Sequence, residues 1–168
     1  FQLAHEIYPN SKYILNNVRN ETMKIKNGAK DLNTVKKLID NKIKIDGVGF
    51  QLHIDGNNPP SFEDIRSMME EYKKIGMKIY ITEFDIDMSK ARGTKLEIKL
   101  KKAYIYQSVI KACLDAENCE QIILFGFTNK VSALEDPGSD PLPYSNSYIP
   151  DISYFAIASE LLENLLAK

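Results

Sequence analysis

The sequence predicts an α/β fold in which four parallel strands alternate with helices. Short apolar runs of strand length alternate with longer segments of helical periodicity along the chain. No low-complexity tract or long charge block interrupts them, and 168 residues with 43% hydrophobic content suffice for one sizeable core. We therefore expect residues 1–168 to form a single domain. Right-handed crossovers would join its strands, either in an open sheet or in part of a barrel.

The first two strand and helix units span residues 13–72. The first strand is the apolar run 13–15, and the apolar face of the following helix consists of Leu32, Val35, Leu38 and Ile39. The second strand covers residues 45–53. After a turn at 57–60, Ser61 is expected to cap a helix whose buried stripe consists of Phe62, Ile65, Met68, Met69 and Tyr72.

The last two units follow the same order. The third strand covers residues 78–83, a helix spans about 95–114, and the fourth strand covers 121–125. The final helix shows an apolar face at helical spacing, made of Tyr154, Ile157, Ala158, Leu161, Leu162 and Leu165. The chain starts without Met, on what looks like a helix already under way, so we expect Phe1 to be an interior cut.

Charge and composition exclude several classes of function. Lys and Arg total 22 against 23 Asp and Glu, so no overall field favours nucleic acid or an anionic membrane. No apolar run has the length of a membrane-spanning helix, and the first residues do not resemble a signal peptide. Cys113 and Cys119 are too few for a metal cluster and form either two buried thiols or one disulfide. We expect a soluble protein with a neutral partner and no metal or cofactor.

The carboxyl ends of the predicted strands carry the candidate site, because the loops of either architecture converge there. They carry Asn16 and Asn17, Gln51 and His53, Glu83 and Asp85, and Thr128 and Asn129. A carboxylate beside an imidazole suits nucleophilic or acid/base chemistry on a neutral polyol, although a lone Glu or His is more often structural. No glycine-rich loop that would hold a phosphate follows any strand. Gln51 and His53 should face the same side of their strand, which favours a shared site.

Several segments resemble glycoside hydrolase family 10, the family of endo-β-1,4-xylanases. Residues 45–53 and 81–86 are similar to the family's sixth and seventh strands. Residues 4–6, 9 and 12–16 are similar to the end of its fourth helix and to its fifth strand, and residues 103–113, 119–128 and 154–157 to its last elements. The resemblance implies half of a TIM (β/α)8 barrel, containing strands five to eight. It also implies a secreted, retaining glycosidase that acts on xylan.

The resemblance assigns roles to the strand-end residues. It makes Glu83 the nucleophile and His53 the residue that orients it, with Gln51 in the same subsite and Asp85 behind them. It places the acid/base carboxyl upstream of Phe1. The remaining candidate substrate contacts are Asn16, Asn17, Phe125 and Asn129.

The chain departs from the family at the subsites for sugar. Tryptophans usually follow the eighth strand, whereas this chain contains none and has Phe125 and Ala133 at those positions. Asn129 stands where Asp is common, and residues 151–153 replace a Lys-Pro-Ala run. Aromatic residues that could substitute in stacking on xylose are Phe125, Phe127, Tyr144 and Tyr148.

The same resemblance implies a disulfide between Cys113 and Cys119, as in secreted members, with two buried thiols as the alternative. Residues 20–22 form an N-glycosylation sequon on a loop expected at the surface. Half a barrel would leave two open edges and an apolar concave face, so we expect the chain to pair with its N-terminal half or with a second copy. Alternative functions are a non-catalytic half-barrel that binds glycan or acts as a scaffold, and an unrelated α/β domain.

Overall fold

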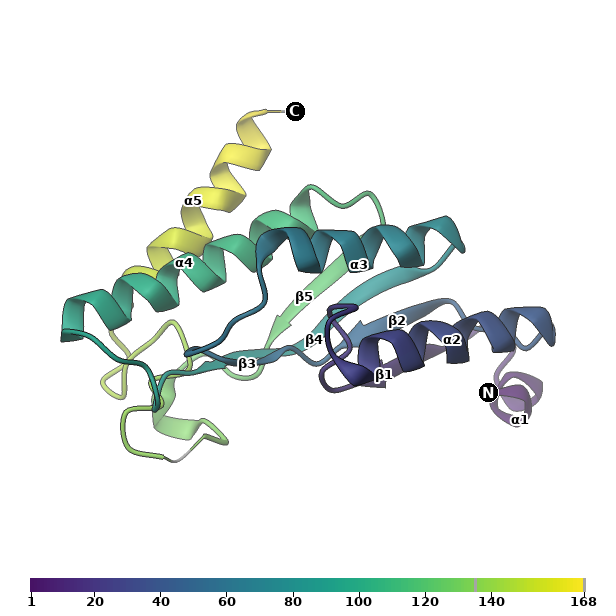
Figure 1. Cartoon of the computed structure of the whole chain (residues 1–168), viewed down its shortest axis with the longest axis horizontal. Coiled ribbons are helices and arrows are strands. Elements are labelled where there is room, and N and C mark those ends of the chain that lie inside the picture. The colour runs from purple at the N-terminus through teal and green to yellow at the C-terminus, as the bar shows by residue number, and fades with distance from the viewer. Residues whose placement is uncertain (135, 168) are drawn as a thin grey trace.

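The computed structural model describes residues 1–134 and 136–167, and it confirms the predicted alternation of parallel strands and helices (Figure 1). The strands are β1 (Ile14–Asn17), β2 (Gly47–Phe50), β3 (His53–Asp55), β4 (Lys78–Asp87) and β5 (Cys119–Leu124). The helices are α1 (Gln2–Ile7), α2 (Lys26–Asp40), α3 (Phe62–Lys74), α4 (Lys95–Leu114) and α5 (Ile152–Leu166), with a short 3-10 helix η1 (Asn129–Val131) that was not predicted. All strand pairs are parallel, in the order β1, β2, β4, β5.

The strand predicted for residues 45–53 is interrupted, which corrects the sequence-based expectation. β2 ends at Phe50, and β3 begins at His53 and pairs with the far end of β4. Leu52 lies between them with a φ of 64°, in the left-handed region that a residue with a side chain rarely adopts. Phe50, Leu52 and Ile54 all lie in the core, so Gln51 and His53 face the opposite side of the sheet.

Beyond Ile81, β4 contains one extra residue relative to both neighbouring strands. Ile81 is paired with Phe50 and Asp85 with His53, which is four residues on β4 against three on the partner. The β5 register shifts in the same interval, between Ile81 and Phe84. Such a bulge re-aims side chains. Ile81 and Phe84 both lie in the core, so the bulge lets Thr82 and Glu83 between them face the open side of the sheet.

The helices begin where the sequence provides caps. The Ser61 side chain accepts a hydrogen bond from the backbone N–H of Asp64, as predicted. Thr94 and Glu97 form a reciprocal capping box at the start of α4. Asp151 caps α5 by accepting from the backbone N–H of Ser153. These caps hold the connections between strands and helices at defined points.

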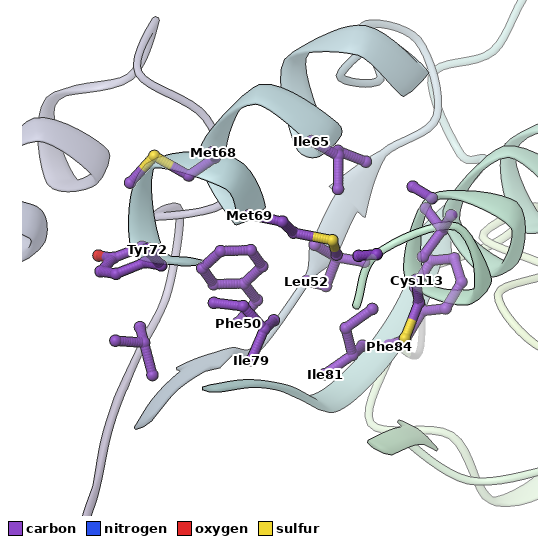
Figure 2. Packing of buried hydrophobic residues seen from close by; sticks show 14 of the residues in the cluster. Phe50, Leu52, Ile65, Met68, Met69, Tyr72, Ile79, Ile81, Phe84 and Cys113 are labelled. Atoms are coloured by element: carbon purple, nitrogen blue, oxygen red, sulfur yellow. The ribbon is translucent and has the colours of Figure 1, made fainter. Parts of the chain in front are cut away.

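The core lies between the sheet and the helices that cover one of its faces. Figure 2 shows side chains of α3 pointing toward the strand residues Phe50, Ile79 and Ile81. The predicted α3 stripe is confirmed for Ile65, Met68, Met69 and Tyr72, which are buried, whereas Phe62 is only partly buried. A disulfide joins Cys113 at the end of α4 to Cys119 at the start of β5, so of the two alternatives left open by the sequence the structure has the disulfide.

The last helix packs on α4 but leaves its apolar side open. α5 crosses α4 and leads away from the sheet in Figure 1. Its buried residues are Ser153 and Glu160, and Glu160 accepts a hydrogen bond from Gln107 of α4 at 2.7 Å. By contrast, Leu162 is 58% exposed and Leu165 is 70% exposed. The helix was therefore predicted correctly, whereas most of its apolar face has no covering layer within the described residues.

Candidate active site

Three ionisable side chains form a hydrogen-bonded chain at the carboxyl ends of the central strands. The imidazole of His53 lies between two carboxyl groups, with Nδ1 2.8 Å from Asp85 Oδ1 and Nε2 3.3 Å from Glu83 Oε2. When both ring nitrogens carry protons, both can donate. Glu83 and His53 therefore lie in one site rather than in two separate ones.

The bulge in β4 brings a second set of polar groups to Glu83. The Thr82 hydroxyl donates to Asn16 Oδ1 at 2.9 Å, and Asn16 Nδ2 donates to Glu83 Oε1 at 3.2 Å. The amide of Asn16 is thereby oriented with its N–H groups toward the carboxylate. A Cβ atom on Gly49 of β2 would overlap the Asn16 side chain, so an alanine there would displace the Asn16 amide. Thr82 was not among the predicted site residues because a regular strand would place it and Glu83 on opposite faces.

The two carboxyl groups differ in environment. The Glu83 side chain is 25% exposed, whereas that of Asp85 is 2% exposed. Burial raises the pKa of Asp85, and the hydrogen bond from His53 opposes this rise. Glu83 is thus the carboxylate open to a ligand, and Asp85 supports the imidazole from behind. Both Glu83 oxygens have hydrogen-bond partners, which fixes the orientation of the group.

Of the other predicted site residues, Phe125 contacts His53, whereas Asn17 and Asn129 bond to residues outside the site. The Phe125 ring meets the His53 ring edge to face at 5.1 Å, so Phe125 joins the site. Asn17 instead bonds to Asp31 of α2. Asn129 donates to Asp140 at 2.5 Å and accepts from the backbone N–H of Leu142 at 2.8 Å, so its amide holds the loop after β5. Gln51 faces the side of the sheet that carries His53.

That loop is fastened to α4 by a buried lysine. Lys102 is fully buried, and its ammonium contacts Asp151 Oδ2 at 2.5 Å and Asp140 Oδ2 at 3.1 Å. It also donates to the backbone carbonyls of Asp140 and Leu142. Phe125 begins this loop. The residues that depart from the family pattern at 129 and 151 therefore both belong to one internal polar network.

The loop after β1 differs from its prediction. Asn20 is fully buried and donates to the backbone carbonyl of Gly49, so the sequon does not lie on an exposed loop and its amide is not available to a glycan. Glu21 and Thr22 are also buried. A run of three polar residues gives no sequence signal for burial, and this loop was therefore missed as part of the site region.

No group of three or more His, Cys, Asp or Glu side chains in the described residues is arranged to hold a metal ion. Within residues 1–134 and 136–167, no helix is long and apolar enough to cross a membrane.

Known proteins share this fold and are 25 to 32% identical to this chain in sequence. The model of glycosyl hydrolase family 10 matches residues 1–160. Endo-1,4-beta-xylanase B of Thermotoga neapolitana is 32% identical over 170 residues, which cover 98% of this chain and 47% of that protein. The native xylanase 10B structure of Thermotoga maritima aligns with a TM-score of 0.90 and 28% identity, covering 100% of this chain and 52% of that one. A xylanase 10C variant of Cellvibrio japonicus in complex with xylopentaose gives a TM-score of 0.87 at 25% identity, covering 97% of this chain and 36% of that one.

The chain spans about half or less of the length of the proteins it matches. It covers 47% of the Thermotoga neapolitana enzyme and 17% of endo-1,4-beta-xylanase B of Neocallimastix patriciarum. The matched region begins at the first residue of the chain.

Proposed function

Because the chain belongs to glycosyl hydrolase family 10, we propose that it carries the nucleophile half of the active site of a retaining β-1,4-xylanase. The observation that carries this proposal is the geometry of Glu83. Its carboxylate is partly exposed at a strand end, accepts a hydrogen bond from Asn16 and lies 3.3 Å from Nε2 of His53. A nucleophile held in one orientation is what formation of a glycosyl-enzyme bond requires.

In the proposed mechanism, Glu83 attacks the anomeric carbon while the leaving oxygen receives a proton from a second carboxylic acid. Water then hydrolyses the glycosyl ester, with the second group acting as base. His53 positions Glu83, and Asp85 holds the imidazole through Nδ1. Phe125, edge to face with His53, provides an apolar surface for a sugar ring, although a phenylalanine is smaller than an indole.

The second carboxyl group has to come from outside the side chains that surround Glu83. Retaining enzymes hold the two groups about 5 to 5.5 Å apart. The neighbouring carboxyl on β4, Asp85, is 2% exposed and bonded to His53, so it is not placed to reach a leaving group. We assign the acid/base to the four strands that would complete the barrel.

The exposed apolar residues of β5 and α5 are where four further strands and their helices would pack to complete the barrel. β1 and β5 are the edges of the sheet, Ile123 of β5 is 43% exposed, and α5 leaves Leu162 and Leu165 open. An N-terminal half-barrel would cover these surfaces. In its absence we expect two copies of the chain to associate through them, burying more than about 1,000 Å². Light scattering from a monodisperse monomer would contradict this expectation.

The function is tested by joining the chain to a matching N-terminal half. We expect the joined protein to hydrolyse xylan and the Glu83→Gln variant to lose at least about a thousandfold in kcat, since the nucleophile is removed. Glu63→Gln is the matched control, because Glu63 is an exposed carboxylate on α3. Equal activity of Glu83→Gln and the joined wild type would refute the assignment.

A non-catalytic half-barrel that binds glycan or acts as a scaffold is the second candidate, because the chain lacks the tryptophans that usually wall the sugar subsites of the family's enzymes. Binding of xylooligosaccharide without turnover in the joined protein would favour this alternative. We also propose that the protein is secreted, because a disulfide persists in oxidising compartments.

A further inference from the structure

The outer face of α4 carries a row of exposed apolar side chains. Leu96 is 60% exposed, Leu100 is 49% exposed and Tyr104 is 67% exposed. Residues four apart form a ridge along a helix, so these three side chains form one row about 12 Å long, called here the α4 outer row. The opposite face of α4 lies in the core through residues such as Tyr106 and Val109. A helix that covers a core normally has polar side chains on its other face, so α4 departs from the usual pattern.

Completion of the barrel would not cover the α4 outer row. Further strands would join at β1 and β5, which are the edges of the sheet. α4 packs against elements of the chain itself, since it contacts α3, α5 and β5 (Figure 1). The exposed residues of α5 that an N-terminal half would cover, Leu162 and Leu165, belong to another helix. The α4 outer row therefore stays exposed with or without that half.

Positive charge flanks the α4 outer row. Residues 90–101 contain five Lys and Arg but a single acidic residue, Glu97. The Glu97 carboxylate accepts hydrogen bonds from the backbone N–H and the hydroxyl of Thr94, at 2.7 and 2.8 Å, so it is directed toward the start of the helix. Among the ion pairs of the described residues, none involves the three lysines beside the row, which are Lys95, Lys99 and Lys101. The surface is therefore apolar along its centre and basic at its sides.

Charge and shape together select the kind of partner. A second copy of the chain would bring the lysines of one row against those of the other, and like charges at an interface repel. A partner with acidic side chains would be attracted instead. Three apolar side chains in one narrow ridge match the packing of a second helix alongside α4. A lipid surface would need a broad apolar face, but the rest of the apolar surface of α4 lies in the core.

We propose that the α4 outer row is a docking surface for an amphipathic helix of a partner protein, with apolar residues along one side of that helix and acidic residues beside them. Leu96, Leu100 and Tyr104 pack against the apolar side, and the neighbouring lysines pair with the acidic residues. Glu83 faces the open side of the sheet whereas α4 covers the other side, so a docked partner leaves the carboxylate accessible. The inference goes beyond the proposed hydrolysis of xylan and does not depend on it.

The test uses two synthetic helical peptides that share one leucine stripe, flanked by glutamates in the first and by lysines in the second. Fluorescence anisotropy of each labelled peptide is measured against the full chain. We expect the acidic peptide to bind at least about tenfold more tightly than the basic one, because the lysines attract one and repel the other. The preference should shrink at high salt, which screens exposed charges.

Variants of the chain locate the contact. Leu100→Asp should weaken binding of the acidic peptide at least about tenfold, because it places a like charge in the centre of the apolar row. The double variant Lys99→Glu with Lys101→Glu should reverse the preference between the two peptides. Leu3→Asp is the matched control, at a leucine of α1 that is 69% exposed, and it should bind like the wild type. Leu162→Asp should also bind like the wild type, because α5 is not part of the surface.

Several results would overturn the proposal. These are equal affinity for the two peptides, no binding of the acidic peptide, and wild-type affinity in Leu100→Asp. A loss of binding in Leu162→Asp with none in Leu100→Asp would place the peptide on the surface that completes the barrel. Cosedimentation with vesicles of phosphatidylcholine and phosphatidylglycerol that requires Leu100, when neither peptide binds, would make a lipid surface the occupant in place of a helix.

Discussion

Replacing Lys102 with methionine should destabilise the chain more than any surface lysine substitution. The ammonium is fully buried and meets four oxygens: Asp140 Oδ2, Asp151 Oδ2 and the carbonyls of Asp140 and Leu142. Loss of the ammonium destabilises the Asp151 carboxylate more than that of Asp140, because the Asp151 side chain is 7% exposed and that of Asp140 is 34% exposed. Breaking a buried ion pair by removing one partner costs about 3 to 5 kcal/mol.

The lower end of that range applies here. Asp151 keeps its hydrogen bond from the backbone N–H of Ser153, and Asp140 regains water, so we expect a loss of about 3 kcal/mol. For a chain of this size that loss corresponds to a decrease of roughly 6 to 12 °C in Tm. Hydrogen exchange should show the loss locally as faster exchange over residues 140–153, since these are the residues that the lysine holds.

The assay is thermal unfolding followed by circular dichroism, with Lys111→Met as the control. Lys111 is on the same helix but 52% exposed, and its ion pair with Asp115 is a surface pair, so its replacement should change stability by less than about 1 kcal/mol. The double variant Lys102→Met with Asp151→Leu should recover much of the loss, because no buried charge is left unpaired. A Tm for Lys102→Met equal to that of Lys111→Met would refute the reasoning.

Three more outcomes are expected. Cys113→Ser with Cys119→Ser should lower the free energy of unfolding by about 2 kcal/mol in urea titrations, because the disulfide closes a short loop, and an unchanged midpoint would contradict this. Glu21→Gln should be more stable than the wild type near pH 7. Burial raises the pKa of Glu21 in the folded wild type, so protonation of Glu21 favours the folded state. The difference in stability between variant and wild type should therefore vanish below the ordinary carboxyl pKa of 4.5, and a difference independent of pH would contradict the burial argument. Gly49→Ala in the joined protein should lower kcat on xylan because the new Cβ displaces the Asn16 amide, and unchanged kinetics would show that this amide has no part in the reaction.

The fold and the centre of the site could be predicted because they depend on patterns that the sequence shows directly. Alternation of apolar runs predicted the parallel sheet. Polar residues at strand ends favoured a shared site, and the resemblance to the family assigned His53, Glu83 and Asp85 to it, where the structure brings them together. The bulge that turns Thr82 toward Asn16 depends on the register of three strands at once, and no local pattern predicts it. The same is true of Leu52, whose left-handed conformation interrupts a strand that reads as continuous.

Burial of polar side chains was the other feature that the sequence did not predict. Asn20 and Glu21 have polar side chains in a loop, a pattern typical of the surface, yet tertiary contacts bury both. Nothing in the sequence distinguishes Lys102 from its partly exposed neighbour Lys101. Only the folded chain brings Asp140 and Asp151 to Lys102. Periodicity predicts which apolar residues face inward, but it carries no information on charged residues that are buried as pairs.

The central claim is that the carboxylate at position 83 forms a bond to sugar. It is tested most directly by treating the joined protein with a 2-deoxy-2-fluoro-xylobioside that has a good leaving group, which slows hydrolysis of the covalent intermediate, and locating the added mass by peptide mass spectrometry. We predict one xylobiosyl unit on the peptide that contains Glu83, and none in the Glu83→Gln variant. A label on another carboxylate, or rapid turnover with no label at all, would contradict the assignment.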